Sequence, residues 1–161
     1  MRRYQDVALR TAYLVCPEAD ADDAVQEAFL KAYAALPRFR EGAPFRPWLL
    51  RIVVNEAKNL ARSNGRAKRA WHRHVLLEIE MPPSDPDSVA LSAERRGALV
   101  QAVRELPPAY QQVVACRYFL DLDEQETAKV LGWPRGTVKS RLSRALRRLR
   151  EILDGQGNHD L

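Results

Sequence analysis

A cationic segment near the C-terminus is the part of the chain whose residue types point most directly to a binding chemistry. Residues 132–150 contain seven basic residues and no acidic one. Apolar residues recur among them at helical spacing, namely Val138, Leu142, Ala145, Leu146 and Leu149. At about 100° per residue, they share one helix face, opposite Ser140, Ser143, Arg144 and Arg147. A helix with an apolar back and a cationic, hydroxyl-bearing front suits a groove of DNA.

The residues just upstream predict the element that would position this helix. Asp123 and Glu126 have the spacing of a capping box, which marks the start of a short helix. Gly132 can end that helix with a sharp turn, and Pro134 suits the start of the next one. We therefore predict a helix-turn-helix whose second helix spans about 135–153. A basic amphipathic helix on a solvated or membrane surface is the alternative, but it does not require the capped helix and turn.

Charge is sorted along the rest of the chain. The 161 residues carry a net charge of +5. Residues 17–27 hold acidic side chains without a basic one, whereas residues 57–73 hold basic side chains without an acidic one. This separation predicts surfaces for two kinds of partner.

The sequence offers no chemistry for catalysis or metal binding. It contains no nucleophile motif and no glycine-rich phosphate loop, so we expect neither catalytic residues nor a cofactor. His72 and His74 would point to different helix faces, and this argues against a metal site. Cys16 and Cys116 are expected as buried, reduced thiols. Without a long apolar run or a signal-peptide core, the chain is predicted to be cytoplasmic.

The pattern predicts an all-α protein of two small helical domains joined by a flexible linker. The expected domains are residues 1–72 and 89–154, with a proline-rich linker at 73–88 and a disordered tail at 155–161. Besides the helix-turn-helix, the predicted helices are 3–15, 20–36, 47–63, 89–105 and 109–119. In the second helix, Asp20 is the expected cap, and the predicted buried stripe is Val25, Phe29, Ala32, Tyr33 and Leu36. In the third, the expected inward residues are Trp48, Leu49, Ile52 and Leu60.

Four blocks of the sequence, in order, resemble the extracytoplasmic-function group of bacterial RNA polymerase sigma factors. The blocks are 20–33, 45–59, 106–114 and 131–142. In that family the first domain would be region 2 and the second would be region 4. One departure is Thr127, because the position before Ala128 is usually a large aliphatic residue in the family. The resemblance implies a transcription initiation factor that binds core polymerase and directs it to −10 and −35 promoter elements.

The resemblance also assigns roles to residues. The acidic helix would dock on the clamp coiled-coil of the largest polymerase subunit, through Asp20, Asp23, Gln26, Glu27 and Leu30. A pocket for a flipped base of the −10 element, with cations for the strand, would involve Phe39, Arg40, Phe45, Asn55, Lys58, Asn59 and Arg62. Core packing is the alternative role for the two phenylalanines and for Trp48.

The cationic helix would read the −35 element as duplex DNA. The expected base-edge contacts are Lys139, Ser140, Ser143 and Arg144, and the expected phosphate contacts are Arg135, Thr137, Arg141 and Arg147. An anti-sigma factor is a further partner that many members of the family have, and no membrane contact is expected. Two rival functions are a free-standing helix-turn-helix regulator and an enzyme with a DNA-binding tail. The first would bind duplex DNA without polymerase, and the second would need a catalytic site within residues 1–80.

Overall fold

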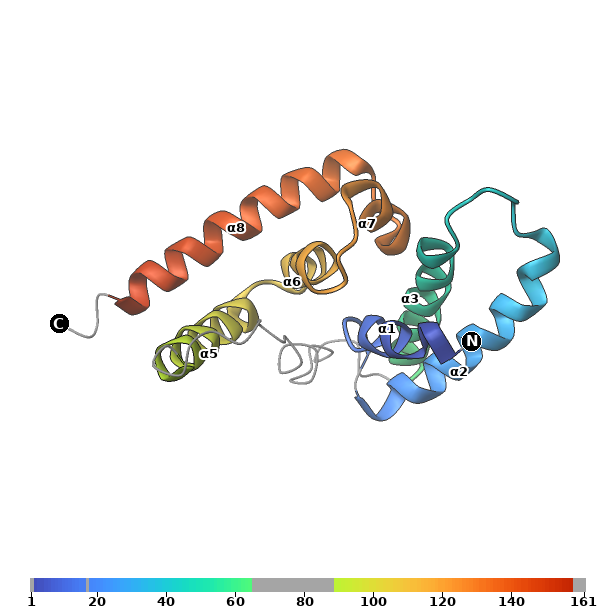
Figure 1. Ribbon diagram of the computed structural model, residues 1–161, viewed down its shortest axis with the longest axis horizontal. Coiled ribbons are helices and arrows are strands. Elements are labelled where there is room, and N and C mark those ends of the chain that lie inside the picture. Colours follow the sequence, from blue (N-terminus) through green and yellow to red (C-terminus); the bar gives the residue numbers. More distant parts are fainter. Residues whose placement is uncertain (1, 17, 65–88, 158–161) are drawn as a thin grey trace.

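The computed structural model describes residues 2–16, 18–64 and 89–157, and every regular element within these ranges is helical (Figure 1). The N-terminal group comprises α1 (Arg2–Ala12), α2 (Glu18–Ala35), the 3₁₀ turn η1 (Leu36–Arg38) and α3 (Phe45–Ser63). The C-terminal group comprises α5 (Val89–Glu105), α6 (Pro108–Val114), the π-helical segment η3 (Ala115–Phe119), α7 (Glu124–Leu131) and α8 (Arg135–Gly157). The predicted all-α class is therefore confirmed. The predicted linker, together with His72 and His74, lies outside the described residues.

Small side chains let the three N-terminal helices pack closely. α2 packs against α3, and α1 contacts both. The side of α2 that faces them is lined by alanines, including Ala21, Ala24 and Ala28, which are at most 1% exposed. The set of buried residues predicted for this helix was partly wrong, because Tyr33 is 70% and Leu36 is 47% exposed. Alanine permits a short distance between helix axes, so the large apolar residues were not needed on the buried side.

Helix boundaries explain other differences from the prediction. Since α2 begins at Glu18, Asp20 lies inside the helix and is not its cap. α3 begins at Phe45, two residues earlier than expected, after Pro44 in an extended conformation. Leu49 is buried as predicted, while Trp48, Ile52 and Leu60 are partly buried.

Polar contacts stabilise the helix ends of the C-terminal group. The buried Gln111 side chain of α6 donates a hydrogen bond to the carbonyl of Arg104, near the end of α5 (2.9 Å). At the start of α7, Asp123 and Glu126 form the predicted capping box, with hydrogen bonds of 2.7 and 2.9 Å. Gly132 ends α7 with φ of 69°. α8 then continues to Gly157, so the prediction that the helix gives way to a tail at residue 155 was wrong.

The two groups pack against each other through α3 and α7, which lie side by side in Figure 1. One apolar cluster includes Leu50 and Val54 of α3 together with Val130 and Leu131 of α7. A second cluster lies within the C-terminal group and joins residues such as Val103, Val113 and Val138. The shared cluster places the helix-turn-helix directly against α3, the helix that follows the loop at residues 39–44. No helix among the described residues is long and apolar enough to cross a membrane.

Candidate nucleic-acid interface

The helix-turn-helix is built by α7 and α8 around the turn at Gly132. Val138 and Ala145 of α8 are fully buried and Leu149 is 7% exposed, so the predicted apolar back of α8 faces the core. Leu142 and Leu146 pack against the same cluster and are partly buried. Because this side is fixed by packing, the opposite side of α8 must face solvent.

The solvent side of α8 carries most of the residues predicted to meet the −35 element. Exposed side chains are Arg135, Lys139, Ser140, Ser143, Arg144 and Arg147. Arg135 lies 3.6 Å from a carboxylate oxygen of Glu124, and the Ser140 hydroxyl donates to the carbonyl of Thr137 (3.2 Å). Each of these two contacts is exposed and readily exchanged for one to DNA or water.

Two predicted contacts, Thr137 and Arg141, are half-buried instead of exposed. The Arg141 guanidinium lies over the ring of Trp133, 4.2 Å from the ring centroid. Stacking of this kind holds the plane of the guanidinium while leaving its edge free to donate hydrogen bonds. Trp133 therefore restricts where Arg141 can point.

The residues predicted for the −10 element lie on α3 and on the loop before it. Asn55, Asn59 and Arg62 are exposed on α3, and Arg40 is exposed in the loop. Lys58 differs, because its side chain is half-buried. Burial lowers the pKa of Lys58, and the nearby cations Arg51 and Arg62 lower it further.

Four aromatic rings support the loop. Phe39 packs on Trp48 with ring centroids 4.8 Å apart, and Phe45 contacts both rings at 5.6 and 5.5 Å. Tyr4 of α1 completes the cluster, 5.3 Å from Phe45. The rings pack on one another and all remain half-buried. This arrangement fixes the shape of the loop and leaves ring surface at the edge of the molecule.

The exposed side of α2 combines acidic and apolar groups. Asp23, Gln26 and Glu27 are exposed, and Leu30 is 67% exposed. Asp20 does not belong to this surface, because it is only 6% exposed and accepts a hydrogen bond from the Asn64 amide (3.0 Å). The expectation that Asp20 faces a partner was therefore wrong. Tyr33, three residues after Leu30, extends the exposed surface.

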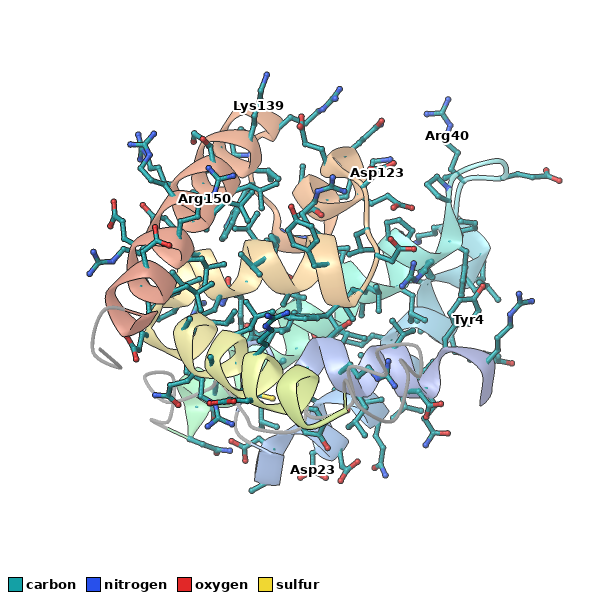
Figure 2. All side chains as sticks on the ribbon, turned by 60° about the vertical axis from the view of Figure 1, so that its left-hand side comes forward. Tyr4, Asp23, Arg40, Asp123, Lys139 and Arg150 are labelled. Carbon is teal, nitrogen blue, oxygen red and sulfur yellow. The ribbon has the colours of Figure 1, made fainter. Side chains whose placement is uncertain are left out.

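The proposed surfaces lie at different edges of the molecule. In Figure 2, Lys139 of α8 and Arg40 of the loop project from the upper edge, whereas Asp23 of α2 lies at the lower edge. The basic and acidic surfaces can therefore meet different partners at the same time.

The two cysteine thiols lie in the interior. Cys16 and Cys116 are free and buried, as predicted. Burial raises the pKa of each thiol to about 12. Within the described ranges, no group of three His, Cys, Asp or Glu side chains could hold a metal ion.

The sequence did not predict the exposed position of Tyr33 or the contacts made by Trp133 and Arg51. Tyr33 could have been found from its spacing to Gln26 and Leu30, which places it on the exposed side of α2. The contact of Arg141 with Trp133 and the hydrogen bond of Arg51 to Val130 could not have been found in this way, because both depend on tertiary packing.

Comparison with known proteins adds two family matches. Residues 1–67 match the family Sigma-70 region 2, and residues 96–149 match the family Sigma-70, region 4.

Individual relatives match most of the chain. The ECF RNA polymerase sigma-E factor of Escherichia coli (strain K12) is 34% identical over 96% of this chain and 82% of its own. The RNA polymerase sigma-H factor of Pseudomonas aeruginosa (strain PAO1) is 35% identical over 84% of this chain and 72% of its own.

Two solved structures have a similar fold. CnrH, in complex with the cytosolic domain of CnrY, has a TM-score of 0.61 and 28% identity, and the match covers 96% of this chain and 84% of that one. The sigma factor RpoE of Bartonella quintana, in complex with the anti-sigma factor NepR, has a TM-score of 0.62 and 24% identity. That match covers 95% of this chain and 96% of that one.

Proposed function

Since this chain belongs to the extracytoplasmic-function group of RNA polymerase sigma factors, we propose how its surfaces divide the work of promoter recognition. The protein is a transcription initiation factor that binds core RNA polymerase and directs it to promoter DNA. The observation that carries the assignment of surfaces is the separation of an acidic and apolar side of α2 from the basic side of α8.

The exposed side of α2 is the proposed docking surface for the clamp coiled-coil of polymerase. It consists of Asp23, Gln26, Glu27 and Leu30, to which we add Tyr33. Exposed large apolar residues among charged ones are typical of a protein interface, because the apolar groups give up water when the partner binds. The carboxylates would set the orientation against a basic partner.

The loop and the exposed polar residues of α3 are proposed to bind the melted −10 strand. The aromatic cluster would hold the loop, and the amides of Asn55 and Asn59 would reach the edges of an unstacked base. Arg40, Lys58 and Arg62 would bind phosphates.

The exposed side of α8 is proposed to read the −35 element in the major groove. Lys139, Ser140, Ser143 and Arg144 are placed for base edges, with Arg135 and Arg147 at phosphates. Arg141, held by Trp133, would reach a phosphate through the edge of its guanidinium. Thr137 is half-buried, so only the part of its side chain that remains exposed would contact a phosphate.

Two further properties follow from this role. The chain would catalyse no reaction itself and would act in the cytoplasm, where polymerase meets the chromosome. An anti-sigma factor is a proposed partner, because the similar Bartonella quintana structure holds one.

The decisive experiment is run-off transcription with core polymerase, together with measurement of core binding. Leu30→Glu should weaken core binding about 30-fold or more, the loss that is typical of a buried interface anchor. Leu99→Glu is the matched control, since Leu99 is another exposed leucine, 40% exposed on α5. Tight, sequence-specific binding of the isolated protein to promoter duplex, without any effect of core, would instead identify a free-standing regulator.

A further inference from the structure

The turn between α7 and α8 carries an aromatic ring that holds one arginine of α8. The Arg141 guanidinium lies over the ring of Trp133, 4.2 Å from its centroid, and both side chains are half-buried. Trp133 precedes α8, which begins at Arg135, so this contact is not one of the regular side-chain pairs within a helix. It joins a residue of the turn to a residue at the edge of the exposed side of α8.

The ring is a rigid support, because the backbone and the side chain of Trp133 are both held in place. The Trp133 N–H donates a hydrogen bond to the carbonyl of Ala128 (3.0 Å). The next residue, Pro134, favours an extended backbone at Trp133, and its carbonyl accepts two N–H groups from the first turn of α8 (3.0 and 3.1 Å). The indole itself packs against both apolar clusters. Arg141 is therefore held by a group that does not move with it.

An aromatic ring holds a guanidinium without neutralising its charge or occupying its hydrogen-bond donors. The face of the guanidinium lies on the ring, while its N–H groups point outward in its own plane. A carboxylate would instead accept those N–H groups and compete with a phosphate, as Glu151 does with one nitrogen of Arg148 (3.0 Å). Among the described residues, no carboxylate pairs with Arg141, so its charge and its donors remain available to an anion.

We propose that Trp133 is a positioning residue for binding of the −35 element, and that it acts through Arg141 on a phosphate of the duplex. A free arginine side chain must give up rotamer freedom to bind a phosphate, whereas stacking on Trp133 removes much of that freedom before DNA arrives. Because a phosphate contact carries no sequence information, the gain is the same for every −35 sequence. The inference rests on the proposed −35 site, and it adds that a residue outside the DNA contacts sets the affinity for all −35 sequences alike.

The test is binding of the holoenzyme, formed from core polymerase and the full chain, to fluorescent duplexes that carry a series of −35 sequences. Trp133→Leu removes the ring but keeps an apolar side chain, so it should weaken binding to every sequence about two- to fivefold. Trp133→Phe keeps an aromatic face and should restore most of this loss. A changed ranking of the −35 sequences, or an equal loss in the two variants, overturns the proposal.

Double mutants separate positioning of Arg141 from a general effect on the helix-turn-helix. In an Arg141→Ala background, Trp133→Leu should cause no further loss, because the side chain through which the ring acts is absent. In an Arg147→Ala background it should cause its full loss, since Arg147 is an exposed arginine of α8 that lies over no aromatic ring of the described chain. Equal further losses in the two backgrounds overturn the proposal.

A second substitution keeps the test decisive if thermal melting shows that Trp133→Leu does not fold. Arg141→Lys keeps the positive charge, but a lysine has no planar group to stack on the indole. It should weaken binding to every −35 sequence about two- to fivefold. Arg147→Lys is the matched control and should change binding less than about twofold, because Arg147 is not stacked. Equal effects of the two lysine substitutions overturn the proposal.

Failure of this proposal is distinct from failure of the proposed function. If Arg141→Ala weakens binding but Trp133→Leu has the same effect in both arginine backgrounds, only the role of Trp133 is wrong. If run-off transcription shows no dependence on the −35 element, the assignment of α8 is wrong, and the role of Trp133 is wrong with it.

Discussion

Among individual residues, Thr127 fits its surroundings least well. It is fully buried on α7, and its hydroxyl has no hydrogen-bond partner among the described residues. A buried hydroxyl without a partner costs about 1–3 kcal/mol. Thr127→Val keeps the shape and removes the hydroxyl, so it should raise the free energy of unfolding by about 1 kcal/mol in urea denaturation.

Thr11→Val is the control for this prediction. Thr11 is equally buried, but its hydroxyl donates to the carbonyl of Val7 (2.6 Å). The same substitution should therefore give no gain at residue 11. Equal effects at the two positions would show that the unpaired hydroxyl is not the cause.

Asn55 is the residue best placed to test base recognition. It is exposed on α3 beside the loop, and its side chain is not needed for packing. Asn55→Ala should reduce discrimination among −10 sequences by about 1–3 kcal/mol and leave core binding unchanged. Transcription from a set of −10 variants measures this. An unchanged ranking of those promoters would remove Asn55 from the site.

Cys116 predicts a specific loss of stability in alkali. Its folded pKa is about 12, whereas an unfolded thiol ionises near its ordinary value. Stability is therefore unaffected below the unfolded pKa and falls above it, by about 1.4 kcal/mol per pH unit, until the folded pKa is reached. Cys16 has a similarly raised pKa and contributes its own loss, so urea denaturation between about pH 8 and 10 should show a steeper fall of stability in wild type than in Cys116→Ala, by up to this slope. Identical slopes would assign the loss to other groups.

At the scale of elements, α8 has two sides with separable functions. Arg144→Ala, on the exposed side, should leave stability unchanged and weaken −35 readout by about 1–3 kcal/mol. Leu149→Ala, on the buried side, should cost about 2–3 kcal/mol of stability, at the low end of the range because Leu149 is slightly exposed. Thermal melting and a series of −35 mutant promoters separate the two effects. Loss of activity by Arg144→Ala on a promoter without a −35 element would contradict this division.

At the scale of the whole molecule, the shared apolar cluster couples the two groups. Leu131 of α7 is 1% exposed and packs in the cluster that contains α1, α2 and α3. Leu131→Ala should therefore lower hydrogen-exchange protection in α2 as well as in α7, by about 2–5 kcal/mol. Leu149→Ala is the control, because it lies in the second cluster and should leave α2 protected. Unchanged protection of α2 in Leu131→Ala would mean that the two groups unfold independently.

The sequence by itself determined the local features of this protein. Capping at Asp123, the turn at Gly132 and the two sides of α8 follow from residues within a few positions of each other, and all were predicted. Family motifs were equally local, and they were sufficient to identify the group to which the chain belongs.

Only the tertiary structure decided which surfaces are free. Asp20 is buried and Tyr33 exposed because alanines, not the larger apolar residues, bring α2 close to α3. Arg51 meets Val130, 79 residues away, through contact of two helices that no local pattern encodes. Helix periodicity gives the direction of a side chain on its own helix, but the partner of that side is set by the packing of the whole chain.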